Sequence, residues 1–189
     1  IGLEVRVQPR LMRVAVGVLL ACIALPAAAG ERSPSFVDAG EVVPGLVVEM
    51  RYAGDHNFVG ARIDGYRRRL CLLTRQAASA LAEVQRDLAP LGLGLKVFDC
   101  YRPSRAVAYF VRWAEDLADQ RGKTEFYPDV DKRDLFRDGY IAARSSHSRG
   151  STVDLTLVRL EAGQPSSEVD MGTPFDLFSP RSWPSDASV

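Results

Sequence analysis

The sequence has no excess of charge of either sign, because 24 lysines and arginines balance 24 aspartates and glutamates. Nothing therefore indicates the basic surface that binds nucleic acid or an anionic membrane. The sequence also lacks internal repeats, low-complexity tracts and glycine-rich phosphate loops, which excludes repeat architectures and the common nucleotide-binding motifs. A chain of 189 residues, of which 47% are hydrophobic, suits one domain with its own core.

No apolar run is long enough for a comfortable transmembrane helix, which needs about 20 residues. The N-terminus instead has the order of an export signal. A short basic region at Met12-Arg13 is followed by an apolar run over residues 14–25 and by three alanines at 27–29. We expect cleavage after Ala29 and no membrane span afterwards, with an uncleaved anchor as the alternative.

Cysteine is scarce, and none of the three cysteines has zinc-finger spacing. Cys22 lies in a possible lipoprotein box, but the residues after it stay apolar, so we prefer a soluble periplasmic or secreted domain over residues 30–189. Residues 1–11 precede the plausible start at Met12. Cys71 and Cys100 remain in the mature chain, and disulfides persist outside the cytosol. We expect these two to form a bridge, with two buried free thiols as the alternative.

Helices and strands are mixed without a βαβ rhythm, which predicts an α+β domain with a small, mainly antiparallel sheet and helices packed on one side. Helices are expected from Thr74 to about Ala89, from Pro103 to Gly122 and over residues 131–138, and strands over residues 42–52, 95–101 and 152–158. The expected buried stripes are Ala77, Leu81, Val84 and Leu88 in the first helix, and Ala106, Phe110, Trp113 or Ala114, and Leu117 in the second. In the last strand Val153, Leu155 and Leu157 share one face, opposite Thr152, Asp154 and Thr156.

Histidine is also rare, and only His56 and His147 occur. His147 lies seven residues before Asp154, which stands in an apolar strand and needs a counter-charge or a metal. Imidazole and carboxylate are both good zinc ligands. For the two to share one ion the segment must turn back, and Gly150 allows this. A surface histidine and a strand aspartate paired with an arginine is the plainer alternative.

Arg102 comes at the junction of the predicted strand 95–101 and the next helix. The residue before proline favours an extended conformation, so Arg102 should lie in the turn. Its guanidinium is suited to bind a carboxylate or a developing oxyanion. A purely structural ion pair with Asp99 is the alternative.

Several spaced motifs together resemble the D-alanyl-D-alanine dipeptidase family of the VanX type, within the zinc D,D-peptidases. The motifs are Asp99-x-Tyr101-Arg102-Pro103, Ser145-x-His147-x-x-Gly150-x-x-x-Asp154-Leu155-Thr156, Tyr52-Ala53, Asn57-Phe58-x-Gly60, Asp64-Gly65-Tyr66 and Met171-Gly172-x-x-Phe175-Asp176. The resemblance covers about residues 42–182. It implies zinc-dependent hydrolysis of the D-alanyl-D-alanine dipeptide, with one Zn²⁺ per subunit.

The resemblance also implies a role for each matching residue. His147 and Asp154 match two of three zinc ligands, and Arg102 matches the arginine that stabilises the transition state. Ser145 matches a contact to the substrate carboxylate. Tyr52 and Asp176 match the groups that receive the substrate ammonium. His56 falls at a position that the family pattern leaves variable, so it is not assigned to zinc.

One family motif has no match in these 189 residues. The family's third ligand and its general base lie in a C-terminal Glu-Trp-Trp-His motif, and neither Glu161 nor Glu168, both expected in a loop, matches it. The sequence is therefore read as an inactive fragment or a degenerate relative. Two other functions stay open, namely a related D,D-carboxypeptidase that accepts longer peptides, and a non-catalytic periplasmic binding domain. Physiological role and oligomeric state are left open.

Overall fold

The structure is a computed structural model that describes residues 36–185. The expected signal peptide over residues 1–29, and the alternatives at Cys22, lie outside the described residues. Within residues 36–185, no helix is both long and apolar enough to cross a membrane.

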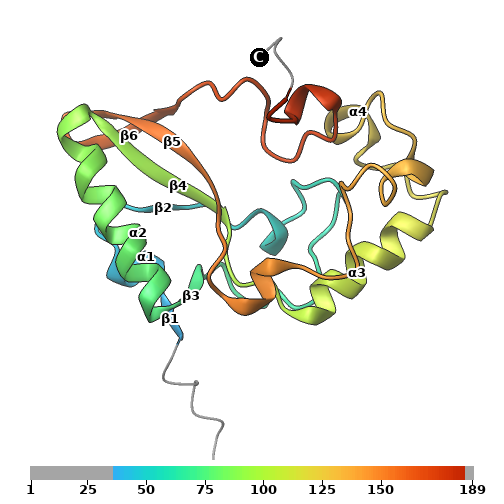
Figure 1. The fold of residues 1–189 in the computed structure, drawn as a ribbon, viewed down its shortest axis with the longest axis horizontal. Coiled ribbons are helices and arrows are strands. Elements are labelled where there is room, and N and C mark those ends of the chain that lie inside the picture. Colours follow the sequence, from blue (N-terminus) through green and yellow to red (C-terminus); the bar gives the residue numbers. More distant parts are fainter. Residues whose placement is uncertain (1–35, 186–189) are drawn as a thin grey trace, which may run out of the picture. The chain divides into compact units, whose positions relative to one another are not determined.

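A four-stranded mixed sheet lies in the left part of the domain in Figure 1. In sheet order its strands are β2 (Val47–Val48), β4 (Leu93–Asp99), β5 (Asp154–Glu161) and β6 (Gln164–Glu168). β4 pairs antiparallel with β5, and β5 with β6, whereas β2 runs parallel to β4. A separate antiparallel pair joins β1 (Phe36–Asp38) to β3 (Leu72–Thr74). The predicted α+β class with a mainly antiparallel sheet is confirmed.

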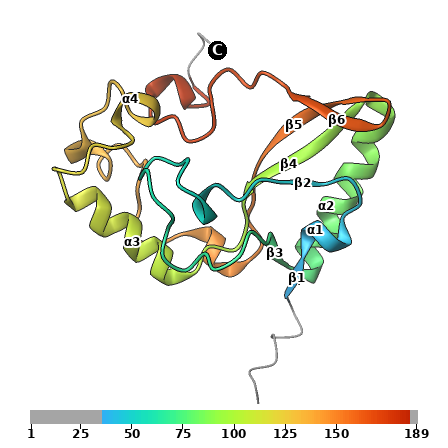
Figure 2. The ribbon, with the colours of Figure 1, turned by 180° about the vertical axis from the view of Figure 1, so that it is seen from behind.

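The helices occupy different parts of the domain. They are α1 (Ala39–Val42), α2 (Arg75–Leu88), α3 (Ser104–Glu115) and α4 (Lys123–Phe126), and 3-10 turns cover Arg51–Ala53, Ala89–Leu91, Lys132–Asp134, Ser146–Arg149 and Pro180–Ser182. α1 and α2 lie beside the sheet, whereas α3 lies at the opposite end of the domain in both views (Figures 1 and 2).

α2 begins at the predicted cap, since the Thr74 hydroxyl accepts a hydrogen bond from the Ala77 amide at 3.3 Å. The predicted stripe is wrong at Val84, which is 48% exposed. The buried residues are Ala78, Leu81 and Gln85. The Gln85 side-chain oxygen accepts from the Leu95 amide of β4 at 2.9 Å, and this polar contact turns the Gln85 face toward the sheet.

α3 follows Pro103 as predicted, but it ends at Glu115 and not at Gly122. Leu117, expected in the buried stripe, lies beyond the helix and is 43% exposed. The early end has a polar cause. The buried Lys132 ammonium donates to the carbonyls of Asp116 and Asp119, each at 2.7 Å, and these bonds hold the chain in a turn.

The two long strands depart from their predicted limits. β4 covers residues 93–99 and not 95–101, and β5 begins at Asp154. Leu155 is 41% exposed and Thr156 is buried, against the predicted polarity of the faces. Thr156 pairs with Lys96, on the sheet face where Phe175 stacks on Phe98 with ring centroids 4.4 Å apart. The returning segment around Phe175 therefore covers this face.

The sulfur atoms of Cys71 and Cys100 form a disulfide, and both cysteines are 0% exposed. The bridge ties the residue before β3 to the residue after β4. The part of the core next to α3 is aromatic. Its rings, which contact one another between α3 and the surrounding loops, belong to Tyr52, Phe58, Phe110, Trp113, Tyr127 and Phe178.

Candidate active site

The six residues singled out from the sequence line one cleft of about 320 Å³. They are Tyr52, Arg102, Ser145, His147, Asp154 and Asp176. They come from the start of β5, from the 3-10 turns Arg51–Ala53 and Ser146–Arg149, and from loops. Residues 124 positions apart in the sequence thus face the same space. The structure brings together every predicted site residue.

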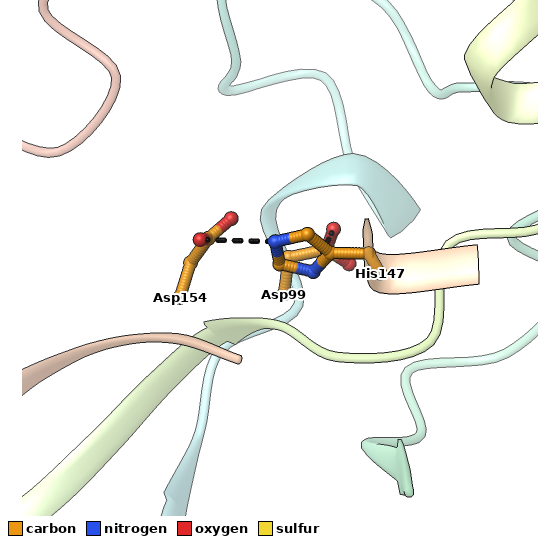
Figure 3. Close-up of side chains that lie close together, drawn as sticks. All are labelled: Asp99, His147 and Asp154. Atoms are coloured by element: carbon orange, nitrogen blue, oxygen red, sulfur yellow. Dashed lines mark ion pairs between the residues drawn. The ribbon is translucent and has the colours of Figure 1, made fainter. Parts of the chain in front are cut away.

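His147 is held by the turn that contains it. The Ser145 hydroxyl caps the turn by accepting from the His147 amide at 3.3 Å. Gly150 ends it in the left-handed region at φ 73°, and a Cβ there would lie 2.1 Å from the Phe36 ring. The chain therefore turns back as expected, and the His147 imidazole faces the Asp154 carboxylate (Figure 3).

The two ring nitrogens of His147 have different partners. Nδ1 lies 2.9 Å from the Cys100 carbonyl oxygen, which is an acceptor only, so Nδ1 carries the hydrogen. Nε2 lies 3.2 Å from an Asp154 carboxylate oxygen. In the neutral ring both of these facing atoms are acceptors, and they repel unless a proton or a metal ion lies between them. This donor set fits a zinc ion.

Arg102 forms the wall beside these two groups. Its Nε donates to an Asp99 oxygen at 2.9 Å, and Nη2 forms an ion pair with the same oxygen at 2.8 Å and donates to Asp154 at 3.4 Å. Its guanidinium lies over the Tyr52 ring, 5.2 Å from the centroid. The structural pairing with Asp99 and the position in the cleft therefore coexist, and neither excludes the other.

Asp99 is fully buried and lies within 4.8 Å of the ligand atoms of His147 and Asp154 (Figure 3). The three residues form a possible metal-binding group. However, one Asp99 oxygen accepts from the Tyr66 hydroxyl at 2.7 Å, and the other accepts from Arg102. Burial raises the pKa of Asp99, and the Arg102 guanidinium opposes this rise. With both oxygens engaged, Asp99 supports Arg102 and His147 and lies behind the candidate ligand pair His147 and Asp154.

Electrostatics also distinguish His147. Burial by itself lowers the pKa of this imidazole, but the hydrogen bond to Asp154 and its negative charge raise it, and the net shift is upward. The site therefore favours positive charge at the Nε2 side of the ring.

The other end of the cleft holds an acid and a phenol. The Tyr52 hydroxyl donates to Asp176 at 2.8 Å. Asp176 has φ 63°, an uncommon conformation for a residue other than glycine, and it follows Phe175, whose ring is fixed on Phe98. Burial raises the pKa of Asp176 to about 7, although the Tyr52 hydrogen bond opposes the shift. A cation placed here would favour the ionised carboxylate.

Comparison with known proteins agrees with this geometry. Residues 32–189 match the family described as D-ala-D-ala dipeptidase. The chain belongs to this family. It is 42% identical over 147 residues to the D-alanyl-D-alanine dipeptidase of Enterococcus faecalis, and the aligned region covers 78% of this chain and 71% of that protein. It is 42% identical to the one of Streptomyces coelicolor, over 77% of this chain and 70% of that protein.

A more distant member of the same dipeptidase family is the D-alanyl-D-alanine dipeptidase of Escherichia coli. It is 34% identical over 77% of this chain and 63% of that protein. Family membership makes the cleft the candidate site of peptide hydrolysis, and its size suits a small peptide.

Two predictions from the sequence concern residues outside this cleft. His56 is exposed, and its Nδ1 lies 2.6 Å from Arg51 and its Nε2 2.6 Å from Glu125. It therefore lies outside the cleft, consistent with the prediction that it does not bind zinc. Glu161 and Glu168 lie in strands β5 and β6, which corrects the predicted loop. The Glu168 carboxylate pairs with Lys96 at 2.7 Å.

Sequence reasoning gave Asp99 only a structural role and missed Tyr66 as its partner. The spacing of Asp99 and Arg102, three residues apart, was the available signal for their pairing. Tyr66 lies 33 residues before Asp99, and nothing in the sequence apart from the motif Asp64-Gly65-Tyr66 indicates that its hydroxyl binds Asp99.

Proposed function

We propose that the chain forms the substrate cleft, with two of the zinc ligands, of a zinc-dependent enzyme that hydrolyses D-alanyl-D-alanine, with one Zn²⁺ per subunit. The observation that carries the proposal is the pair of facing acceptors, His147 Nε2 and the Asp154 carboxylate, 3.2 Å apart in a cleft that also contains Arg102. His147 and Asp154 would hold the ion. Bound there, zinc would polarise the peptide carbonyl and lower the pKa of water.

Arg102 is proposed to stabilise the transition state. Its Nη2 points toward Asp154, so its remaining hydrogens can reach a carbonyl oxygen next to the metal ligands. Asp99 fixes the guanidinium through the hydrogen bond that it accepts from Nε and the ion pair with Nη2, and this leaves little reorganisation for the reaction step. Arginine is suited to this role because its planar donors are preorganised.

The two ends of the cleft are proposed to read the two ends of a dipeptide. Asp176 and the Tyr52 hydroxyl would accept the substrate ammonium, because an ionised carboxylate only accepts hydrogen bonds. The Ser145 hydroxyl oxygen accepts from the His147 amide, and its own hydrogen is free to donate to the substrate carboxylate. A requirement for both termini would restrict the site to dipeptides.

The described residues direct two ligands into the cleft, whereas catalytic zinc sites commonly have three protein ligands. No glutamate lines the cleft among residues 36–185. We therefore expect the 189-residue chain by itself to bind zinc weakly and not to turn over the dipeptide. This ligand count also favours the second candidate, a binding domain that keeps the peptide pocket without catalysis.

The test combines metal binding, peptide binding and turnover on the purified chain. Zinc titrated by calorimetry should bind the parent and the His56→Ala control alike, and should bind His147→Ala and Asp154→Asn at least about tenfold more weakly. D-Ala-D-Ala should bind, but its N-acetyl form and a pentapeptide should not. Equal zinc affinity in all four proteins would refute the metal site, tight pentapeptide binding would favour a D,D-carboxypeptidase, and appreciable release of D-alanine would refute the expected inactivity.

We also propose a periplasmic or secreted location, with a role in cell-wall metabolism or glycopeptide resistance. The Cys71–Cys100 disulfide supports a location where disulfides persist. A fusion of residues 1–35 to a reporter enzyme that is active only after export tests the location. Reporter activity equal to that of a leaderless fusion would contradict it.

A further inference from the structure

A second groove of about 710 Å³ lies between α3 and the segment that leads to His147. Three arginines line it, Arg112 on α3, and Arg144 and Arg149 on the facing segment. The rest of its lining is four serines and four small apolar residues, with no aspartate or glutamate. The groove therefore carries three positive charges in a chain whose formal net charge is zero.

The lack of carboxylates distinguishes this groove from two others that contain arginine. The groove on α2 has Glu83 beside its arginines, and the groove near Tyr66 has Asp64. Within residues 36–185, none of Arg112, Arg144 and Arg149 forms an ion pair with a carboxylate. The Arg112 guanidinium lies over the ring of Tyr109, which does not line the groove, at 5.6 Å from the ring centroid. Arg144 and Arg149, which have no carboxylate partner among residues 36–185, therefore favour an anionic ligand.

This groove, which we call the arginine groove after Arg112, Arg144 and Arg149, continues into the catalytic cleft. Four residues, Val107, Arg144, Ser145 and Ser146, line both spaces. The junction is at Ser145, at the opposite end of the cleft from the Tyr52–Asp176 pair if the peptide lies as proposed. α3 and the turn Ser146–Arg149 lie side by side in both views (Figures 1 and 2). A group that leaves the cleft at the carboxyl end of a bound peptide would enter this groove.

We infer that the arginine groove is a subsite for a carboxylate carried by the carboxyl-terminal part of a peptide ligand. The inference rests on the proposed function and extends its substrate class beyond D-alanyl-D-alanine. The apolar lining residues accept the aliphatic part of the ligand, and Arg144 and Arg149 bind its negative end. The carboxylate is the acidic side chain of the second residue, because the cleft itself is proposed to take the C-terminus of the dipeptide at Ser145.

The experiment compares peptides that differ in one charge. The 189-residue chain is titrated by calorimetry at low salt with D-Ala-D-Ala, D-Ala-D-Glu, D-Ala-D-Gln and the tripeptide D-Ala-D-Ala-D-Ala. Exposed ion pairs each contribute up to about fivefold in affinity, so D-Ala-D-Glu should bind about fivefold to tenfold more tightly than D-Ala-D-Gln. High salt should remove most of the difference. Tighter binding of the tripeptide than of D-Ala-D-Gln would assign the groove to a C-terminal carboxylate and overturn both the side-chain assignment and the restriction to dipeptides.

Variants assign the effect to the groove. The ratio of affinities for D-Ala-D-Glu and D-Ala-D-Gln should fall below about twofold in Arg144→Gln combined with Arg149→Gln, and should stay at the parent value in the control Arg75→Gln, which lies in the groove with Glu83. Equal affinity of the parent for the two peptides would overturn the inference while binding of D-Ala-D-Ala still supports the dipeptide site. A ratio unchanged in the double variant would also overturn it, whereas failure of every peptide to bind would overturn the proposed function itself.

Discussion

The strongest single test of the site's construction is Asp99→Asn. Asp99 is 0% exposed, and it accepts from the Tyr66 hydroxyl at 2.7 Å and from Arg102 Nε at 2.9 Å, and forms an ion pair with Arg102 Nη2 at 2.8 Å. Asparagine has nearly the same shape, but it has no charge, and its amide nitrogen must face one of these donors. Removing one partner of a buried ion pair costs about 3–5 kcal/mol. Because Arg102 is 16% exposed and partly solvated, we expect a loss near the lower limit, about 3 kcal/mol.

Urea unfolding followed by tryptophan fluorescence measures this loss. With a slope of about 2 kcal/mol per molar urea, the midpoint should fall by about 1.5 M. The matched control is Asp131→Asn, because Asp131 forms an exposed ion pair with Arg133 at 3.8 Å and caps a 3-10 turn, a role that asparagine fills equally well. The control should change stability by less than about 0.5 kcal/mol. Equal midpoints for the parent and Asp99→Asn would show that the buried carboxylate does not support the site.

Three further perturbations test other parts of the structure. Because the pKa of Asp176 is raised to about 7, its contribution to stability should be lost as pH rises from about 4 to about 7, and urea unfolding across this range should show a flatter profile for Asp176→Asn; parallel profiles would contradict the assignment. Replacing Cys71 and Cys100 together by serine removes a link across 29 residues and should lower the free energy of unfolding by about 3–4 kcal/mol, whereas a loss below about 1 kcal/mol would contradict the entropic estimate. Gly150→Ala should cost about 2 kcal/mol or more and weaken zinc binding, because its methyl group would overlap Phe36 and left-handed backbone disfavours alanine; a calorimetric melting temperature equal to the parent's would count against this.

The sequence predicted the parts of the fold that depend on local patterns. The cap at Thr74, the proline before α3 and the turn at Gly150 follow from short-range chemistry, and all three are found. The predicted buried stripes are wrong at Val84 and Leu117 because polar groups distant in the sequence determine the local structure. The Leu95 amide binds Gln85, and the Lys132 ammonium binds carbonyls beyond the end of α3.

The short strands could not be predicted in this way. β2 has two residues, and β1 and β3 have three each, so their pairing partners define them and not any periodicity. β6 contains Pro165 and is exposed throughout, which conceals its strand character. It is recovered only through its pairing with β5, after a turn at Ala162 and Gly163, both with positive φ.

The site likewise contains some features that local sequence patterns predict and others that depend on residues far apart in the sequence. The return of the chain from His147 to Asp154 could be inferred from the seven-residue spacing and the glycine between them. The pairing of Tyr52 with Asp176 spans 124 residues, and no periodicity connects them; only the family resemblance placed both at one site. Asp99 was foreseen as a partner of Arg102, but its second hydrogen bond to Tyr66 depends on tertiary packing.

The Cys71–Cys100 crosslink has a consequence for how the protein must be prepared. The carbonyl group that fixes the tautomer of the His147 ring belongs to Cys100, so the orientation of the imidazole depends on a residue that oxidation anchors to the start of β3. Chain produced in a reducing cytosol would lack this anchor, and its histidine would be free to present either nitrogen to the cleft. If the proposed zinc site exists, samples that differ only in thiol state should therefore differ in zinc affinity.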